Sequence, residues 1–137
     1  MPERTRCVLL VDDEARILSA LRRVLRREGF EIVTAESAAE ALRVMDERCV
    51  DAVVSDQKMP GGSGLELLAE ASRRHPRAAR MLITGLAQEI PRAELEAAGV
   101  CALITKPWDD ERLRATLRRA LAGGSAEGRG LPGPGSS

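Results

Sequence analysis

Charged and hydroxyl side chains stand directly after short apolar runs in this chain, in positions where they could handle a phosphoryl group or a metal ion. Asp12 and Asp13 follow the first apolar run, and Asp56 follows the third. Thr84 ends the fourth run and Lys106 follows the fifth. If the runs are parallel strands, these side chains meet beyond the carboxyl edge of one sheet, where open α/β sheets bind their ligands. The spacing therefore predicts a site with three carboxylates, a hydroxyl and an ammonium group.

Three carboxylates in one pocket repel one another unless a cation joins them or a proton is taken up. Oxygen-only ligands select a hard cation, and Mg²⁺ suits a few carboxylates completed by water. Mg²⁺ and the Lys106 ammonium would together balance the three negative charges. Converting Asp56 to an acyl phosphate adds about one negative charge, which Lys58 is close enough in sequence to offset. This set is suited to accepting a phosphoryl group onto a carboxylate, with Mg²⁺ and Lys106 stabilising the transferring oxygens.

Apolar runs and helical periods alternate along most of the chain. Strands are predicted over residues 7–11, 31–35, 52–55, 80–84 and 102–105. Helices are predicted over residues 15–28, after a capping-box pattern at Ser37, around Leu65 and Leu68, from Pro91 to Ala98, and after a cap at Asp109. No hairpin signal separates these elements, so we expect an α/β fold with a parallel sheet covered by helices on both faces.

Composition narrows the classes of function. The 137 residues include 21 basic and 21 acidic ones, and zero net charge argues against a nucleic-acid binder that works by overall electrostatics. The longest apolar stretches have five residues, so neither a membrane span nor a signal peptide is expected. Cys7, Cys49 and Cys101 are expected to be buried, reduced thiols of a cytoplasmic protein. Residues 123–137 are rich in Gly, Pro and Ser and are expected to form a disordered tail after a domain over residues 5–122.

Four segments in order also match one known family. They are Val11-Asp12-Asp13-Glu14, Ser55-Asp56-Gln57-Lys58-Met59-Pro60 with Gly64 following, Ile83-Thr84-Gly85, and Thr105-Lys106-Pro107. On these segments, residues 5–122 resemble the receiver domain of two-component response regulators. The resemblance implies a flavodoxin-like five-stranded parallel sheet of order 2-1-3-4-5.

The resemblance implies a role for each site residue. Asp56 would be the phosphoacceptor, Asp13 and Asp56 would bind Mg²⁺ directly, and Asp12 would bind it through water. The backbone carbonyl of Lys58 would complete the protein's share of the metal ligands.

The phosphoryl group would be held by residues at the ends of the last two strands. Lys106 would bind its oxygens and Thr84 would swing its hydroxyl onto them, while Gly85 would give the backbone room to approach. The Lys106–Pro107 bond would be cis, as the family has it. Leu103 departs from the family pattern, because many receivers carry Tyr or Phe there and move it inward with the threonine.

The expected partners follow from the same resemblance. A sensor histidine kinase or phosphotransfer protein would donate the phosphoryl group, and a downstream protein would bind the Pro91–Ala98 helix, the last strand and the last helix. No direct nucleic-acid or membrane contact is expected, and the oligomeric state is left open. The tract from Lys106 to Asp109 is similar to receivers attached to outputs such as HD-type phosphodiesterases or transcription activators. Trp108 is expected to pack the loop after the last strand, with a partner contact as the alternative.

Three other interpretations stay open beside the preferred stand-alone phosphorylation switch, which is not a turnover enzyme. The chain could be an interaction module that keeps the pocket without using phosphorylation, or the receiver part of a longer regulator. An aspartate-based phosphohydrolase is disfavoured, because such enzymes place a second aspartate two residues after the first, where this chain has Lys58.

Overall fold

Apolar strand residues fill both faces of a central sheet in the computed structural model, which describes residues 5–85 and 89–123. The strands are β1 (Cys7–Val11), β2 (Glu31–Ala35), β3 (Ala52–Asp56), β4 (Lys58–Met59), β5 (Gly62–Ser63), β6 (Ala79–Thr84) and β7 (Ala102–Thr105). The helices are α1 (Ala15–Leu25), the 3₁₀ turn η1 (Arg26–Glu28), α2 (Ala38–Glu47), α3 (Gly64–Arg74), α4 (Arg92–Ala97) and α5 (Asp110–Ala122).

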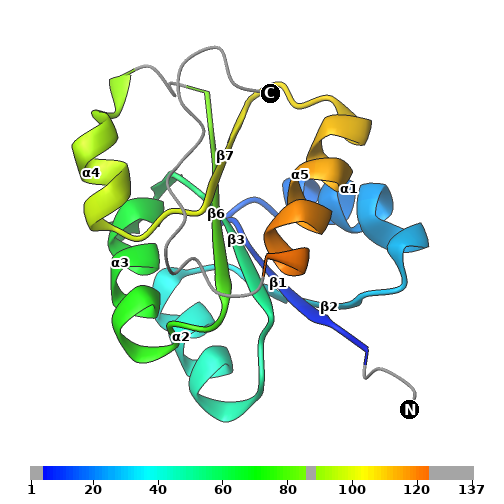
Figure 1. Cartoon of the computed structure of the whole chain (residues 1–137), viewed down its shortest axis with the longest axis horizontal. Coiled ribbons are helices and arrows are strands. Elements are labelled where there is room, and N and C mark those ends of the chain that lie inside the picture. Colours follow the sequence, from blue (N-terminus) through cyan, green and yellow to red (C-terminus); the bar gives the residue numbers. More distant parts are fainter. Residues whose placement is uncertain (1–4, 86–88, 124–137) are drawn as a thin grey trace.

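The main sheet has five strands in the order β2-β1-β3-β6-β7, and every neighbouring pair is parallel. Figure 1 shows α1 and α5 on one side of this sheet and α2, α3 and α4 on the other. Because β6 and β7 are the fourth and fifth strands of the sheet, the order is the predicted 2-1-3-4-5. The α/β fold with helices on both faces is confirmed.

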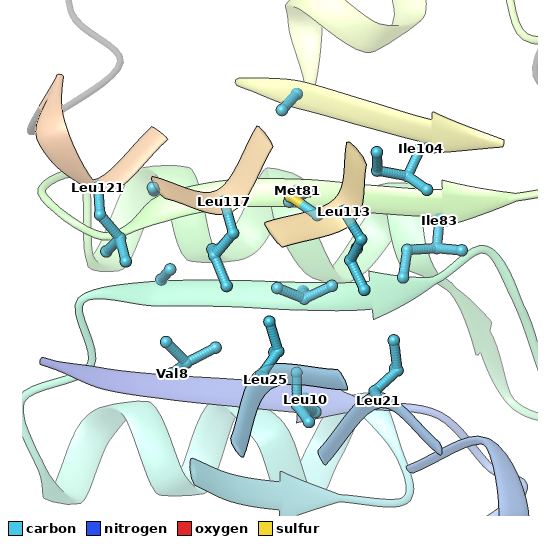
Figure 2. Close-up of a cluster of buried hydrophobic side chains, with 14 of the residues drawn as sticks. Val8, Leu10, Leu21, Leu25, Met81, Ile83, Ile104, Leu113, Leu117 and Leu121 are labelled. Carbon is cyan, nitrogen blue, oxygen red and sulfur yellow. The ribbon is translucent and has the colours of Figure 1, made fainter. Parts of the chain in front are cut away.

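Side chains along each strand point alternately to the two faces of the sheet, and a hydrophobic core lies on each face. All five residues of β1 are 2 % exposed or less, and they alternate between the two faces as successive side chains of a strand must. Val8 and Leu10 face α1 and α5, where Figure 2 shows Leu21 of α1 and Leu117 of α5 pointing onto the strands. Leu9 faces the second core, under α2, α3 and α4. Because both faces of the sheet are packed, the residues that directly follow the strands are held in fixed positions.

Local signals at the helix ends act largely as predicted. Ser37 accepts a hydrogen bond from the Glu40 N–H at 3.1 Å at the start of α2, and Asp109 accepts one from the Arg112 N–H at 2.9 Å at the start of α5. The first helix differs in detail, because its α-helical part ends at Leu25 and continues as η1. Gly29 then closes it with a positive φ of 82°, a backbone conformation that glycine adopts without steric cost.

A small hairpin after β3 corrects the expectation that the chain contains none. β4 and β5 pair antiparallel, with Lys58 opposite Ser63 and Met59 opposite Gly62. Pro60 and Gly61 make the turn, and the φ of Gly61 is +82°. Proline followed by a glycine of positive φ is the chemistry of a type II turn, so the Pro-Gly pair was a turn signal that the sequence interpretation overlooked.

The cysteines require a second correction. All three are free thiols, but only Cys7 is buried, Cys101 is half-buried and Cys49 is exposed. Cys49 lies between the end of α2 and β3, where the chain crosses the surface. Apart from Gly123, the C-cap residue of α5, the predicted tail lies outside the described residues. Among residues 5–85 and 89–123, no helix is long and apolar enough to cross a membrane.

Candidate phosphoacceptor and metal site

Parallel pairing brings the predicted site residues to one edge of the main sheet. Asp12 follows β1 directly and Asp56 ends the neighbouring strand β3. Thr84 ends β6, and Lys106 follows β7, whose last residue pairs with Thr84. The Lys106 N–H also donates a hydrogen bond to the Thr84 carbonyl oxygen at 2.9 Å. The carboxyl ends of four strands therefore converge on one site.

Three aspartates form an acidic cluster at this edge. Asp12, Asp13 and Asp56 each offer one carboxylate oxygen, and these oxygens lie within 4.8 Å of one another. Asp12 is 1 % exposed and Asp56 is 9 % exposed, whereas Asp13 is exposed, so the cluster is closed on the protein side and open toward solvent. Hard oxygen ligands with one open side fit Mg²⁺, which keeps water on its remaining positions. The cluster could thus hold a divalent cation beside Asp56.

Lys106 contacts Asp56 directly. Its Nζ is 2.8 Å from Asp56 Oδ1, and its side chain is 29 % exposed. Burial lowers the pKa of Lys106, but the hydrogen bond and charge of Asp56, together with the charge of Asp12, outweigh burial and hold the pKa above its ordinary value. The lysine is therefore charged at neutral pH. The Lys106–Pro107 peptide bond is cis, as the family resemblance implies.

Burial sets the protonation of Asp12. Removal from water raises the pKa of this carboxyl from 3.8 to about 6, against the lowering effect of the Glu14 N–H, which donates to Asp12 Oδ1 at 2.9 Å. The charge of Asp56 raises the pKa further and that of Lys106 lowers it. Without a cation, Asp12 thus takes up a proton near pH 6, which is one way to relieve the repulsion within the cluster.

We expect the contribution of Asp12 to the stability of the metal-free protein to fall as pH rises from about 4 to about 7. Between the ordinary pKa of about 3.9 in the unfolded chain and about 6 in the fold, the folded state binds a proton that the unfolded chain does not hold. The contribution of Asp12 to the free energy of unfolding therefore decreases with pH there, by at most about 3 kcal/mol. Urea unfolding across this range measures it. Asp12→Asn should flatten the profile, and an unchanged profile in that variant would contradict the assignment.

Thr84 is buried beside a cavity. It is 3 % exposed and lines a hollow of about 540 Å³ together with Gln57 and Lys58, the two residues that follow Asp56. The Lys58 side chain is exposed, so it can reach added negative charge from the solvent side. The metal-ligand role of the Lys58 carbonyl and the swing of the Thr84 hydroxyl stay predictions.

Glycine is required at one matched position and not at another. A Cβ at Gly64 would lie 2.3 Å from the Asp56 carbonyl oxygen and 2.7 Å from Leu82 Cδ1, so only glycine lets α3 begin against the end of β3. Gly64 therefore packs tightly against the end of β3. A Cβ at Gly85 would lie 3.9 Å from Lys106 Cβ, which is ordinary contact. The role of Gly85 toward a phosphoryl group stays a prediction.

Leu103 and Trp108 lie on opposite sides of the sheet. Leu103 is half-buried against the core under α2, α3 and α4. Trp108 packs on the core under α1 and α5, and its indole N–H donates to Asp110 Oδ1 at 3.2 Å. Trp108 therefore packs the loop after β7, as expected.

The fold and the acidic edge define a class of protein, and comparison with known proteins gives the family. The model of the response regulator receiver domain matches residues 8–118, and the chain belongs to that family. Receiver domains are phosphoacceptor signalling switches rather than turnover enzymes. The family typically uses Mg²⁺ in phosphorylation and interacts with histidine kinases or phosphotransfer proteins and with downstream effectors.

Several relatives are similar over most of this chain. The hydrogenase transcriptional regulatory protein HoxA of Bradyrhizobium diazoefficiens is 39 % identical over 115 residues, which is 83 % of this chain and 24 % of that protein. HoxA of Cupriavidus necator is 38 % identical over 134 residues, 97 % of this chain and 27 % of that protein. The chain thus spans about a quarter of the length of these curated relatives.

A solved structure has the same fold throughout. The signal receiver domain of an HD domain-containing protein from Pseudomonas fluorescens Pf-5 superposes with a TM-score of 0.84 at 31 % identity, covering 90 % of this chain and 91 % of that one.

Proposed function

We propose that this chain is the phosphoacceptor switch of a two-component phosphorelay, phosphorylated on Asp56 with Mg²⁺ bound by the acidic cluster. The position of Asp56 carries the proposal. Its carboxylate is 2.8 Å from the Lys106 ammonium and also belongs to the three-aspartate cluster. A nucleophile next to both a candidate cation site and a fixed lysine is suited to receive a group that brings negative charge.

The transfer itself needs little covalent chemistry from the protein. A carboxylate oxygen of Asp56 attacks the phosphorus of a phosphohistidine, the P–N bond breaks, and the imidazole leaves with the bonding electron pair and takes up a proton. Bound Mg²⁺ supplies charge stabilisation for the transferring oxygens. Lys106 holds the same oxygens on the protein side. Asp13 would hold the cation directly and Asp12 would hold it through water. Once the phosphoryl group is attached, the Thr84 hydroxyl donates a hydrogen bond to one of its oxygens.

Acetyl phosphate tests the function without a partner protein. Incubation with acetyl phosphate and Mg²⁺, followed by intact mass measurement, should show the mass increase of one phosphoryl group. No incorporation from acetyl phosphate, nor from any sensor kinase of the source organism, would instead favour an interaction module that keeps the pocket without using phosphorylation.

The output is proposed to be a changed protein-binding surface over α4, β7 and α5. Only Leu95 is buried among the six residues of α4, so this helix is weakly held and can shift at low cost. Leu103 of β7 packs on the same core as Leu95 and can follow Thr84 inward without a polar penalty. The surface would bind a downstream protein when Asp56 is phosphorylated.

Replacing Thr84 by alanine should weaken the switch. A hydrogen bond from the Thr84 hydroxyl to a charged phosphoryl group contributes about 1.5–3 kcal/mol, a shift of about 10- to 100-fold in an inactive–active equilibrium. A change from 1:99 to 99:1 needs about 5.5 kcal/mol, so Lys106 must contribute as well. Hydrogen exchange with and without beryllofluoride should show protection changes in α4, β7 and α5 of the wild type. Smaller changes are expected in Thr84→Ala, and equal changes in both proteins would refute the role of Thr84.

The domain is proposed to work either alone or within a longer regulator. This chain matches about a quarter of the length of the HoxA proteins, which supports a receiver domain that belongs to a longer protein. The similarity of the tract from Lys106 to Asp109 to receivers with HD-type or transcriptional outputs belongs to this proposal, as do the boundary of the domain at residue 122 and a cytoplasmic location. Phosphotransfer profiling against sensor kinases would name the donor.

A further inference from the structure

Gln57 supplies two hydrogen-bond acceptors at the start of α3, in addition to the N-cap residue Ser63. The first four amides of a helix have no partner within the helix, and the N-cap side chain normally satisfies one of them, at the second or third position. Here the Gly64 N–H donates to the Gln57 carbonyl oxygen at 2.9 Å, and the Leu65 N–H donates to the side-chain Oε1 of Gln57, also at 2.9 Å. Ser63 accepts the third amide, that of Glu66, at 3.1 Å, and Glu66 Oε1 in turn accepts the Ser63 N–H at 2.9 Å, which completes a capping box. One residue eight positions before Leu65 thus serves two of these amides.

The same glutamine is also tied to the sheet. Its own N–H donates to the Ile83 carbonyl oxygen of β6 at 3.1 Å. Gln57 therefore connects the end of β3, the end of β6 and the start of α3 by three hydrogen bonds. It lies in the chain between Asp56, the proposed phosphoacceptor, and Lys58, whose carbonyl is the proposed fourth protein ligand of Mg²⁺.

The hairpin that Gln57 precedes is also held by the Ser63–Glu66 capping box and by Met59, which packs on the core under α2, α3 and α4. Lys58 is exposed and pairs with Ser63 across the hairpin, and Ser63 is in turn the N-cap of α3. The start of α3 cannot retreat toward β3, because the Asp56 carbonyl oxygen already excludes any side chain at Gly64. The side-chain bond of Gln57 to Leu65 therefore adds a link between the beginning of this segment and α3, beside the backbone bond from Gly64 and the capping box.

We propose that Gln57 is a positioning residue of the magnesium and phosphoryl site, whose side-chain oxygen anchors the segment that carries the Lys58 carbonyl to the start of α3. This inference rests on the proposed function and adds to it a residue outside the set of ligands and phosphoryl contacts. Partners that orient a metal ligand matter for affinity, and their loss typically weakens metal binding about 10- to 100-fold. Gln57 acts on the position of the segment and does not contact a ligand atom. We therefore expect its loss to weaken Mg²⁺ affinity about tenfold, the lower end of this range.

Mg²⁺ titration followed by the fluorescence of Trp108, the single tryptophan of the chain, tests the proposal. Gln57→Met keeps the length of the side chain and removes its amide, including the acceptor for the Leu65 N–H, so it should bind Mg²⁺ about tenfold more weakly. Gln57→Glu keeps an acceptor and should restore affinity. Because an added carboxylate could also attract Mg²⁺ by charge, amide hydrogen exchange at Leu65 is measured without metal. It should be fast in Gln57→Met and slow again in Gln57→Glu.

Asp51→Ala is the matched control. The Asp51 side chain accepts the Cys7 N–H at 2.7 Å, at the opposite end of β1 from the site, so its loss removes a comparable side-chain to backbone bond far from the metal. This variant should be less stable and bind Mg²⁺ as the wild type does. If Gln57→Met does not fold, Gln57→Asn, which is too short to reach Leu65, is measured in its place.

The outcomes separate this inference from the proposed function. Wild-type affinity in Gln57→Met, or an equal loss in Asp51→Ala, overturns the role of Gln57 and leaves the proposed function standing. Absence of Mg²⁺ binding in the wild type, or undiminished binding in Asp13→Ala, overturns the metal site itself and the inference with it.

Discussion

The Asp56→Asn variant is expected to incorporate no phosphoryl group from acetyl phosphate under conditions in which the wild type is labelled. An amide cannot act as the nucleophile that a carboxylate provides, and among the described residues the other two acids of the cluster, Asp12 and Asp13, are not placed against Lys106 at 2.8 Å as Asp56 is. Intact mass measurement reports the loss directly. Undiminished incorporation in this variant would refute the assignment of Asp56.

The same variant should keep the fold and its stability. Asparagine retains an oxygen where Asp56 Oδ1 accepts from Lys106, and it removes one of three mutually repelling charges. The midpoint of urea unfolding, measured without Mg²⁺, should therefore equal or exceed that of the wild type. Asp46→Asn is the matched control, since Asp46 is an exposed carboxylate of α2 that bonds His75 at 2.8 Å away from the site. Its phosphorylation should be unchanged.

The Lys106→Met variant should be phosphorylated about 100-fold more slowly than the wild type. Methionine keeps much of the length of the side chain but removes the ammonium that lies 2.8 Å from Asp56. The negative charge on the transferring oxygens then has no hydrogen-bond donor at this position. Loss of one such preorganised donor typically costs about 10²–10³ in rate. The time course of phosphoryl incorporation at saturating Mg²⁺ measures the effect.

Lys106→Arg distinguishes charge from geometry. Arginine keeps the positive charge but replaces a compact ammonium by a planar fork, which does not fit the same contact. We expect a rate between those of the wild type and Lys106→Met. Because the pKa of Lys106 is held above its ordinary value, the wild-type rate should not change near neutral pH through this residue. A rate in Lys106→Met within about twofold of the wild type would contradict the role, since the donor is expected to contribute far more.

Much of the fold could be predicted from local pattern. The five buried runs are strands because both faces of the sheet are packed, and a residue such as Leu9 is apolar for the same reason as its neighbour Leu10. The caps at Ser37 and Asp109 could be predicted because a cap is a contact between residues three apart in the chain. The hairpin after β3 was missed, although its Pro-Gly turn is an equally local signal.

Contacts between distant segments could not be predicted in the same way. Arg80 was interpreted as the first residue of a strand, yet it is 4 % exposed and its guanidinium donates to the carbonyl oxygens of Ala78 at 2.6 Å and Gly99 at 2.7 Å. Nothing in the spacing of charges identifies an arginine that is satisfied by carbonyls rather than by a carboxylate. The exposure of Cys49 likewise depends on where the loop after α2 crosses the surface.

The amino-acid sequence by itself determined which side chains this site contains, because residues that directly follow buried parallel strands must emerge at one edge of the sheet. Only the tertiary structure decided how those side chains are held: the 2.8 Å contact of Lys106 with Asp56, the closeness of α3 that requires Gly64, and the bond from Gln57 to Leu65. The hydrophobic periodicity of a strand or helix indicates which of its side chains are buried, and it can be recognised in one segment at a time. A hydrogen bond across eight or fifty residues depends on the packing of several segments to within a few tenths of an ångström, and no single segment contains that information.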